Sequence, residues 1–430
     1  MKSTAKCYDK LRSYLETVPL IDTHDHTGDV VEEYTDPIAV VCGGYFSHDL
    51  MSASSAKEID FVRDSSKSMD ERWPVLEKAW MRSCHTGYAR VTKMVLREFY
   101  GVDELSLAAL KGMKDKLMDM GDRKLFTKLL NKAKIKARLE DCWADWDKVY
   151  DKTYKMSPKG KLVIGIPFFH AVSSHEEIKR PGNSVGIDVT TLDEYVVACR
   201  EVFDRFKSFG AVAFKDQSAY SRTLEYTNPT RAEAEEVFNY LMADPRRTVG
   251  HPDGKRKLDD YLFHCFMRMA KEMELPVQIH TGHMAGIWND IEKTNAVKLR
   301  SVLELHRDVR FDLFHANWPY SGELLYLCKN YPNVHIDFCW ANIIDPVYCQ
   351  RMFKQALSSV PHGKIHAYGS DFGGHADRAW AHASMARDNV AIALSEMVDM
   401  AYLDLDEAKE VARMWLFDNA NAFFKLGITY

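Results

Sequence analysis

The 430-residue sequence has little that would direct it to a membrane or to a nucleic acid. No stretch approaches the ~18 consecutive apolar residues of a membrane-spanning helix. The opening segment, residues 1–10, is not followed by the apolar core and cleavage site of a signal peptide, so we do not expect export. The 57 Lys and Arg residues are balanced by 62 Asp and Glu residues without any block of like charge, whereas nucleic-acid binding usually needs a basic stripe. We therefore expect neither a membrane nor a nucleic acid as a partner.

Closely paired cysteines are also absent from the sequence. The nine cysteines are odd in number and scattered, and no C-x-x-C pair occurs. This spacing indicates neither a disulfide framework nor a thiolate zinc site. Reduced, buried cysteines are typical of a cytoplasmic protein, which is the location we expect. The hydrophobic content of 46% is enough for the large core of a globular chain.

Short apolar runs alternate with longer amphipathic stretches, which is the pattern of βα units around a parallel sheet. Eight such runs occur, and they cover residues 18–24, 133–139, 162–167, 211–215, 276–280, 310–315, 334–338 and 365–371. Eight is the number of strands that closes a (β/α)8 barrel. We therefore predict an α/β fold, a distorted (β/α)8 TIM barrel, in which residues 1–430 form a single domain.

A long segment, roughly residues 30–125, separates the first predicted strand from the second. It is too long for a simple βα loop, and residues 73–94 and 105–118 show helical patterning. We predict a helical insertion after strand 1 that lies over the C-terminal mouth of the barrel, where it could help to enclose a substrate. A second expansion, residues 223–253, precedes a predicted helix over residues 258–273.

The end of the first predicted strand carries the sequence His24-Asp25-His26. Alternate residues of a strand point to the same face, so both imidazoles would project into the barrel mouth. An H-x-H pair alone is weak evidence for a metal site, because histidines fall two apart by chance. Its position strengthens the case, since the C-terminal ends of barrel strands form the catalytic face.

Further polar residues stand at the ends of later predicted strands: Lys215 on the fourth, His280 on the fifth, His315 on the sixth and Asp371 on the eighth. Each of them alone could be a hydrogen-bonded core residue or a helix cap. Five strand ends with suitable side chains on one face are improbable by chance. Imidazoles and carboxylates suit Zn, Mn or Fe, so the pattern predicts a site for a divalent transition metal.

This arrangement resembles the metal-ligand pattern of the amidohydrolase superfamily. The segments around it, residues 213–222, 278–283 and 368–371, resemble the amidohydrolase-2 branch. The resemblance covers the first strand and residues from about 160 to 380. The insertion and residues 261–282 are similar to uronate isomerases, whereas the segment around Lys215 is more similar to the amidohydrolase domain of nodulin-like proteins fused to glutamine synthetases.

The resemblance implies that His24, His26, His280 and Asp371 hold the metal, for which we expect zinc. We favour one ion, and a second stays open. In superfamily members with two ions, a carboxylated lysine at the position of Lys215 bridges them and the histidine at the position of His315 completes the second site. An unmodified Lys215 would instead bind an anionic substrate. Asp371 would carry the proton from the attacking water to the leaving group, and His315 would orient the substrate carbonyl or stabilise its negative charge.

Several residues near the predicted strand ends are candidates for substrate contact. A guanidinium suits bidentate capture of a carboxylate, although an ordinary salt bridge would explain Arg222 equally well. The mixture of Arg, His and Lys at the mouth indicates a small anionic organic substrate. The candidates are Lys215, Tyr220, Arg222, His283, Trp318, His375 and Arg378.

The leading hypothesis is a metal-dependent hydrolase of a C–N or C–O bond, an amide or a lactone, in a small carboxylate-bearing molecule. The main alternative is a sugar-acid isomerase similar to uronate isomerases. Non-oxidative decarboxylation of an aromatic acid is less favoured, because many such relatives have Glu-x-His in place of His24-Asp25-His26. A metal-binding scaffold without activity is disfavoured by Asp371 beside the complete histidine set. The sequence leaves a homo-oligomer open.

Overall fold

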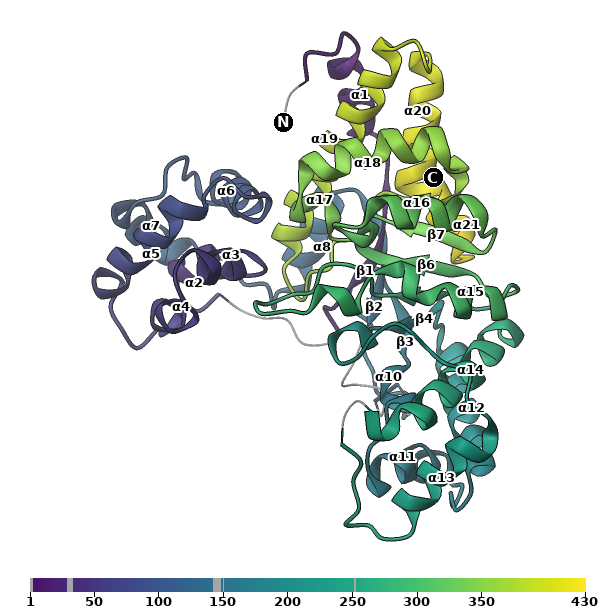
Figure 1. Ribbon diagram of the computed structural model, residues 1–430. Helices are drawn as coiled ribbons and strands as arrows, with labels where there is room; N and C mark the ends of the chain where they lie inside the picture. The colour runs from purple at the N-terminus through teal and green to yellow at the C-terminus, as the bar shows by residue number, and fades with distance from the viewer. Residues whose placement is uncertain (1–2, 29–33, 142–147, 150, 251–252) are drawn as a thin grey trace.

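Eight parallel strands form the centre of the molecule (Figure 1). The computed structural model describes residues 3–28, 34–141, 148–149, 151–250 and 253–430. Neighbouring strands pair in sequence order from β1 to β8, so the predicted TIM barrel is confirmed. The strands are β1 (Leu20–Asp25), β2 (Ile135–Asp141), β3 (Gly160–Gly165), β4 (Ala213–Asp216), β5 (Val277–Ile279), β6 (Phe311–Leu313), β7 (Val334–Asp337) and β8 (Ile365–His366).

The barrel is brought to closure by backbone hydrogen bonds between β1 and the segment that follows β8. The amide of Thr23 donates to the backbone oxygen of Tyr368 at 3.3 Å, and the amide of Asp371 donates to that of His24 at 2.9 Å. Gly369 allows the two segments to approach closely, because a Cβ at this position would lie 2.5 Å from Thr23 Oγ1. The first and last strands therefore meet at the mouth, where the predicted metal ligands are.

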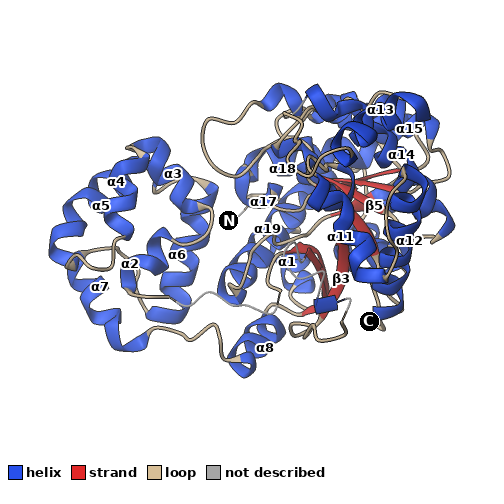
Figure 2. Ribbon diagram, turned by 90° about the horizontal axis from the view of Figure 1, so that it is seen from below, coloured by secondary structure: helices blue, strands red, loops and turns tan. Residues whose placement is uncertain are grey.

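Helices surround the strands and cover the outside of the barrel (Figure 2). Helix α12 illustrates how the sequence sets their ends: Thr191 and Glu194 form a capping box at its start, and Gly210 ends it in the left-handed conformation at φ 109°. None of the described helices is long and apolar enough to cross a membrane. The described α-helices outside the insertion are α1 (Tyr8–Leu15), α8 (Arg123–Lys132), α10 (Pro167–His170), α11 (His175–Val185), α12 (Leu192–Phe209), α13 (Arg231–Met242), α14 (Arg256–Glu272), α15 (Arg300–Leu305), α16 (Ser321–Asn330), α17 (Ala341–Ile344), α18 (Pro346–Ser359), α19 (Ala376–Asp399), α20 (Leu405–Arg413) and α21 (Asn419–Phe423).

The segment between β1 and α8 forms a group of helices that stands beside the barrel, on the left in Figures 1 and 2. Its α6 packs against α17 and α19 of the barrel wall, whereas α8 itself packs on β2 and α19. Hydrogen bonds join the group to the mouth: the Tyr45 hydroxyl donates to the backbone oxygen of Asp371, and the Gly286 amide donates to His48 Nδ1 at 3.2 Å. The helices are α2 (Pro37–Cys42), α3 (Phe46–Ala53), α4 (Ala56–Arg63), α5 (Met69–Ser83), α6 (Gly87–Tyr100) and α7 (Leu107–Met113).

Two strands differ from their predicted bounds in ways that matter at the mouth. Strand β2 continues to Asp141, two residues past the predicted end at 139, because Glu140 and Asp141 remain in the ladder with β3. Strand β8 ends at His366, well before the predicted end at 371. Asp371 lies in the left-handed region at φ 57°, so the chain turns sharply at this ligand and does not continue as a strand.

A buried polar layer lies inside the barrel beneath the mouth. Because side chains alternate along a strand, Gln278 lies one layer below His280. Its Nε2 donates to the Thr23 backbone oxygen at 2.9 Å and to Asp312 Oδ2 at 3.2 Å. Asp312 Oδ1 is 2.9 Å from His366 Nδ1, and all these side chains are buried. The layer ties β1, β5, β6 and β8 together directly under the site.

A buried ion pair fixes the end of β1. Asp25 points away from the two histidines that flank it. Its carboxylate accepts a hydrogen bond from the Arg138 guanidinium of β2 and another from the Thr27 amide at 2.7 Å. The side chains of Asp25 and Arg138 are 3% and 1% exposed. Since Asp25 is held on one face of the strand, the neighbouring His24 and His26 are directed to the other face.

The Arg138→Met variant should lose about 3 to 5 kcal/mol of unfolding free energy, because it leaves the Asp25 carboxylate buried and unpaired. Arg97→Met is the matched control: Arg97 and Asp103 pair at 2.7 Å, but their side chains are 72% and 75% exposed. Its loss should be below about 1 kcal/mol. Urea unfolding followed by circular dichroism measures both variants. Equal losses would show that the Asp25–Arg138 pair is not an important structural contact.

Candidate metal centre

Three side chains from the two ends of the sheet converge at the mouth. His24 and His26 come from the end of β1, and Asp371 comes from the segment after β8. Nε2 of His24 lies 3.1 Å from Nε2 of His26. Asp371 Oδ1 lies 3.1 Å from His26 Nε2 and 3.6 Å from His24 Nε2. One nitrogen from each imidazole and one carboxylate oxygen therefore face a common point.

The spacing of these three atoms fits a divalent ion. Two ligand atoms bound to a tetrahedral zinc at ordinary bond lengths are about 3.3 Å apart. The three separations between His24, His26 and Asp371 lie between 3.1 and 3.6 Å. Two imidazoles and a carboxylate are also donors that suit Zn, Mn or Fe. This group can therefore hold an ion without rearrangement.

The charges at the mouth suit metal binding. Burial acts to raise the pKa of Asp371, but the surrounding imidazoles of His24, His26 and His315 outweigh burial and hold that pKa well below its ordinary value. Burial also lowers the pKa of His24 well below its ordinary value and lowers the pKa of His315 to about 4. Burial also acts to lower the pKa of His26, but the hydrogen bond and the charge of Asp371 outweigh burial and raise that pKa. At neutral pH the site therefore has an ionised Asp371 beside neutral His24 and His315, and metal binding would release the proton that His26 tends to hold.

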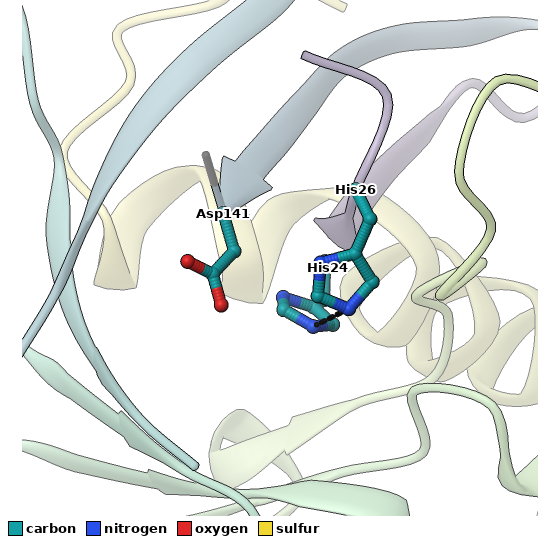
Figure 3. A group of neighbouring side chains, drawn as sticks. All are labelled: His24, His26 and Asp141. Atoms are coloured by element: carbon teal, nitrogen blue, oxygen red, sulfur yellow. Dashed lines mark hydrogen bonds between the residues drawn. The ribbon is translucent and has the colours of Figure 1, made fainter. Parts of the chain in front are cut away.

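Asp141 joins this group from the end of β2. One of its carboxylate oxygens lies within 4.8 Å of donor atoms of both His24 and His26. Figure 3 shows the carboxylate beside the two imidazoles. The sequence prediction missed Asp141 because the apolar run of the second strand stops at residue 139. The acidic pair Glu140-Asp141 directly after that run was the available signal.

His280 and His315 face one another on the other side of Asp371. His280 Nδ1 lies 3.1 Å from His315 Nε2, and Asp371 Oδ2 is 3.8 Å from His315 Nε2. His315 Nδ1 lies 2.9 Å from the backbone oxygen of Cys339, which can only accept, so this nitrogen carries the proton and Nε2 presents a lone pair. An imidazole in that state cannot donate to negative charge on a substrate. The geometry therefore contradicts the charge-stabilising role predicted for His315 and favours metal ligation.

Lys215 extends from β4 into the same region. Its side chain is buried, and among the described residues Nζ has no hydrogen-bond partner. The amine lies 4.1 Å from the centre of the Phe314 ring. Burial lowers the pKa of Lys215, although Asp141 and Asp371 oppose that effect. Lys215 therefore has unused hydrogen-bond donors beside the ligand group.

Three of the predicted substrate contacts lie around the ligands. The Tyr220 ring is 4.7 Å from the His280 ring, and its hydroxyl accepts from the Ala285 amide at 3.1 Å. His283 and Trp318 line a cavity of about 660 Å³ between α3 and the loops after β5 and β6. The His283 backbone oxygen bonds His280 Nε2 at 2.8 Å. The cavity therefore adjoins the ligand group through His283.

Both predicted arginines and His375 have partners outside the ligand group. Arg222 pairs with Asp260 of α14 at 2.6 Å. Arg378 donates to Thr92 of α6 at 3.3 Å and to the backbone of α2, so it ties the insertion to α19. His375 stacks on Tyr34 at 5.0 Å. Of the described residues that line the cavity, none is an arginine or a lysine. The two guanidinium groups therefore bond protein groups outside this cavity, and their contact with a substrate stays a prediction.

A third group of donors, Asp312, Asp337 and His366, belongs to the buried polar layer. Asp312 is engaged by His366 and Gln278, and Asp337 Oδ1 accepts from the Cys339 amide at 2.7 Å. These side chains are fully buried below the mouth. The bonds within the layer account for this group as a support for the residues above it.

Comparison with known proteins is consistent with this geometry. Residues 168–426, more than half of the chain, match the model of the amidohydrolase family, Amidohydro_2. The chain belongs to this family. Protein fluG of Emericella nidulans is 24% identical over 238 residues, which are 52% of this chain and 27% of fluG. This amidohydrolase therefore spans about a quarter of the length of that curated relative.

Solved structures share the fold of this amidohydrolase. The uronate isomerase of Thermotoga maritima is 16% identical, with a TM-score of 0.76 over 98% of both chains. The glucuronate isomerase of Caulobacter crescentus is 17% identical, with a TM-score of 0.71 over 100% of this chain and 96% of the other. The chain is therefore a member of the amidohydrolase superfamily whose described residues include groups of side chains that could hold a metal ion.

The His24→Ala variant should retain less metal than the wild type after dialysis, because it removes one of three converging donors. His306→Ala is a matched control: His306 is also a buried histidine, but it pairs with His264 at 2.8 Å and does not face the ligands. Elemental analysis of both variants and of the wild type measures the metal content. Equal metal content in the wild type and His24→Ala would contradict the assignment of His24 as a ligand.

Proposed function

We propose that this amidohydrolase hydrolyses a C–N or C–O bond, an amide or a lactone, in a small carboxylate-bearing substrate, with zinc as its metal. One observation carries the proposal: Asp371 is a buried carboxylate whose oxygens face imidazoles on both sides. Because those imidazoles keep its pKa low, Asp371 is ionised at neutral pH and can accept a proton. His24, His26 and Asp371 would hold the ion, with Asp141 close by. His280, the fourth predicted ligand, faces His315 on the other side of Asp371.

A bound divalent ion would polarise the substrate carbonyl and lower the pKa of a water molecule toward neutrality. In the proposed reaction the water oxygen bonds to the carbonyl carbon, and the bond from that carbon to the leaving nitrogen or oxygen breaks. Asp371 takes a proton from the water and returns it to the leaving atom. Lys215 supplies unused N–H donors within the same buried region, so it can orient the substrate carboxylate or carbonyl.

The cavity beside the ligands indicates the size of the substrate. At about 660 Å³ it is within the ordinary range for small-molecule sites. Its wall includes His48 and Tyr88 from the insertion and His283 and Trp318 from barrel loops. Arg222 and Arg378 bond other protein groups. The prediction of an anionic substrate therefore rests on Lys215.

A sugar-acid isomerase is the second candidate. The observation that favours it is the likeness to uronate isomerases over 98% to 100% of this chain, which includes the helical insertion. In that reaction Asp371 would move a proton between adjacent carbons and no water would be consumed. Incubation with uronates, followed by chromatography for a ketose product, distinguishes this candidate from hydrolysis of amides and lactones.

The Asp371→Asn variant should lose at least roughly 10²- to 10⁴-fold in turnover, because an amide cannot accept the proton. It should keep its fold, since the amide has nearly the same shape. Asp193→Asn is the control, because Asp193 pairs with Arg231 at the surface, with side chains 66% and 52% exposed. Steady-state rates on a panel of amides and lactones, with metal content measured in parallel, test both. Near-normal turnover of metal-loaded Asp371→Asn would rule out Asp371 as the proton carrier.

A further inference from the structure

We propose that the cavity beside the metal centre binds an alkylammonium group on the distal part of the substrate, with the Asp49 carboxylate as its counter-ion. The inference deepens the proposed function and rests on it for the reaction at the carbonyl. The substrate then has its carboxylate near Lys215 and a positively charged amine in the cavity. This class of molecule, a small amide or lactone with both groups, is narrower than the anionic substrate that the sequence predicts.

The cavity of about 660 Å³ has walls from two parts of the chain. The insertion contributes residues of α3, the start of α4 and Tyr88 of α6, and the barrel contributes the loops after β5 and β6. The backbone oxygen of His283, a wall residue, bonds His280 Nε2 at 2.8 Å. Aromatic rings make a second connection: Tyr88 stacks on Trp340 at 6.1 Å between ring centres, and Trp340 lies 5.2 Å from the His315 ring. A molecule bound at the metal centre can therefore extend into this cavity.

Asp49 gives the cavity its charge. Of the described residues in the wall, it is the only Asp or Glu, and none is Lys or Arg. His48 is neutral in this arrangement, because its Nδ1 accepts a hydrogen bond from the Gly286 amide at 3.2 Å and a protonated imidazole only donates. Burial raises the pKa of Asp49 to about 6, which leaves its carboxylate mostly ionised at pH 7. The cavity therefore has a negative charge that no Lys or Arg of its described wall balances.

Two wall residues carry polar atoms that lack a hydrogen-bond partner among the described residues. These atoms are Asp49 Oδ2 and the Tyr88 hydroxyl, and both are buried. The two residues come from different helices, α3 and α6. Burial raises the pKa of Tyr88 well above its ordinary value, and the nearby charge of Asp49 adds to this effect. An ammonium group has three N–H donors, so one such group can donate to the Asp49 carboxylate and to the Tyr88 hydroxyl.

Aromatic rings supply further contacts for a cation. Trp288 and Trp318 belong to the wall, and the faces of such rings attract ammonium groups. Trp288 is 97% exposed and lies in the left-handed region at φ 64°, a conformation that is rare for a bulky residue. Asn289 holds the loop beside it by donating to two backbone oxygens of the same loop at 3.2 and 3.0 Å. Apolar wall residues suit an alkyl chain, and they include Met51, Ile287 and Ile344.

The same features disfavour other occupants of the cavity. A carboxylate or phosphate would meet the charge of Asp49 without a lysine or arginine from the described wall. A neutral apolar group would fill the space but would leave Asp49 Oδ2 and the Tyr88 hydroxyl without partners, which costs free energy. An alkylammonium group matches both the charge and the apolar part of the wall.

Probes of one size and different charge test this assignment. Butylammonium, 1-butanol and butyrate are titrated against the purified protein, and saturation-transfer NMR gives the three dissociation constants. Butylammonium should bind at least about tenfold more tightly than 1-butanol, because it forms a charge-assisted hydrogen bond with Asp49. Butyrate should bind most weakly, since it carries the same charge as Asp49.

Variants locate the bound amine. Asp49→Asn should weaken the binding of butylammonium at least about tenfold and leave that of 1-butanol nearly unchanged. Asp60→Asn is the matched control, because Asp60 is an exposed residue of α4 in the same insertion and is not part of the wall. Trp288→Leu should weaken the binding of butylammonium about two- to fivefold, the effect of an exposed cation–π contact. Asp371→Asn should keep the preference for butylammonium, because Asp371 belongs to the ligand group.

Equal affinity for butylammonium and 1-butanol, or tighter binding of butyrate, would overturn the proposal. So would normal binding of butylammonium by Asp49→Asn, or loss of the preference in Asp371→Asn. If Asp49→Asn fails to fold, the wild-type ranking and Trp288→Leu still decide the question. The readout needs no turnover, so the two proposals fail separately. Amine binding without hydrolysis of any amide or lactone refutes only the proposed reaction, whereas hydrolysis without amine binding refutes only the amine site.

Discussion

The two oxygens of the Asp371 carboxylate face two different groups of metal donors, and several features of the barrel hold that carboxylate in place. The Asp371 amide bonds the backbone oxygen of His24 at 2.9 Å, and the Tyr45 hydroxyl bonds the backbone oxygen of Asp371. The residue adopts a left-handed conformation at φ 57°. Such a conformation costs roughly 1 kcal/mol or more and persists where the surrounding structure imposes it. Here the closure of the barrel imposes it.

The neighbouring strands contribute in the same way. The buried pair of Asp25 and Arg138 directs His24 and His26 toward Asp371. The polar layer around Gln278 and Asp312 supports the strands directly below. The insertion adds Tyr45 at the mouth and helps to wall the adjoining cavity. Metal ligands, cavity and insertion are therefore linked through direct contacts at one end of the barrel.

The sequence predicted the barrel well because strands buried on both faces leave continuous apolar runs. The sequence also predicted that the polar residues at several strand ends lie together, since the C-terminal ends of parallel strands share one face. It missed Asp141 because polar residues can continue a strand. It assigned Arg222 and Arg378 to the substrate, whereas their partners, Asp260 and Thr92, are distant in sequence.

The most direct test of the account is the position of the metal in the folded protein. Crystals of the zinc-loaded protein, measured on both sides of the zinc absorption edge, locate each ion by anomalous difference density. The account predicts density among His24, His26 and Asp371 Oδ1. Density that lies instead among Asp312, Asp337 and His366, or that avoids Asp371 altogether, would contradict it.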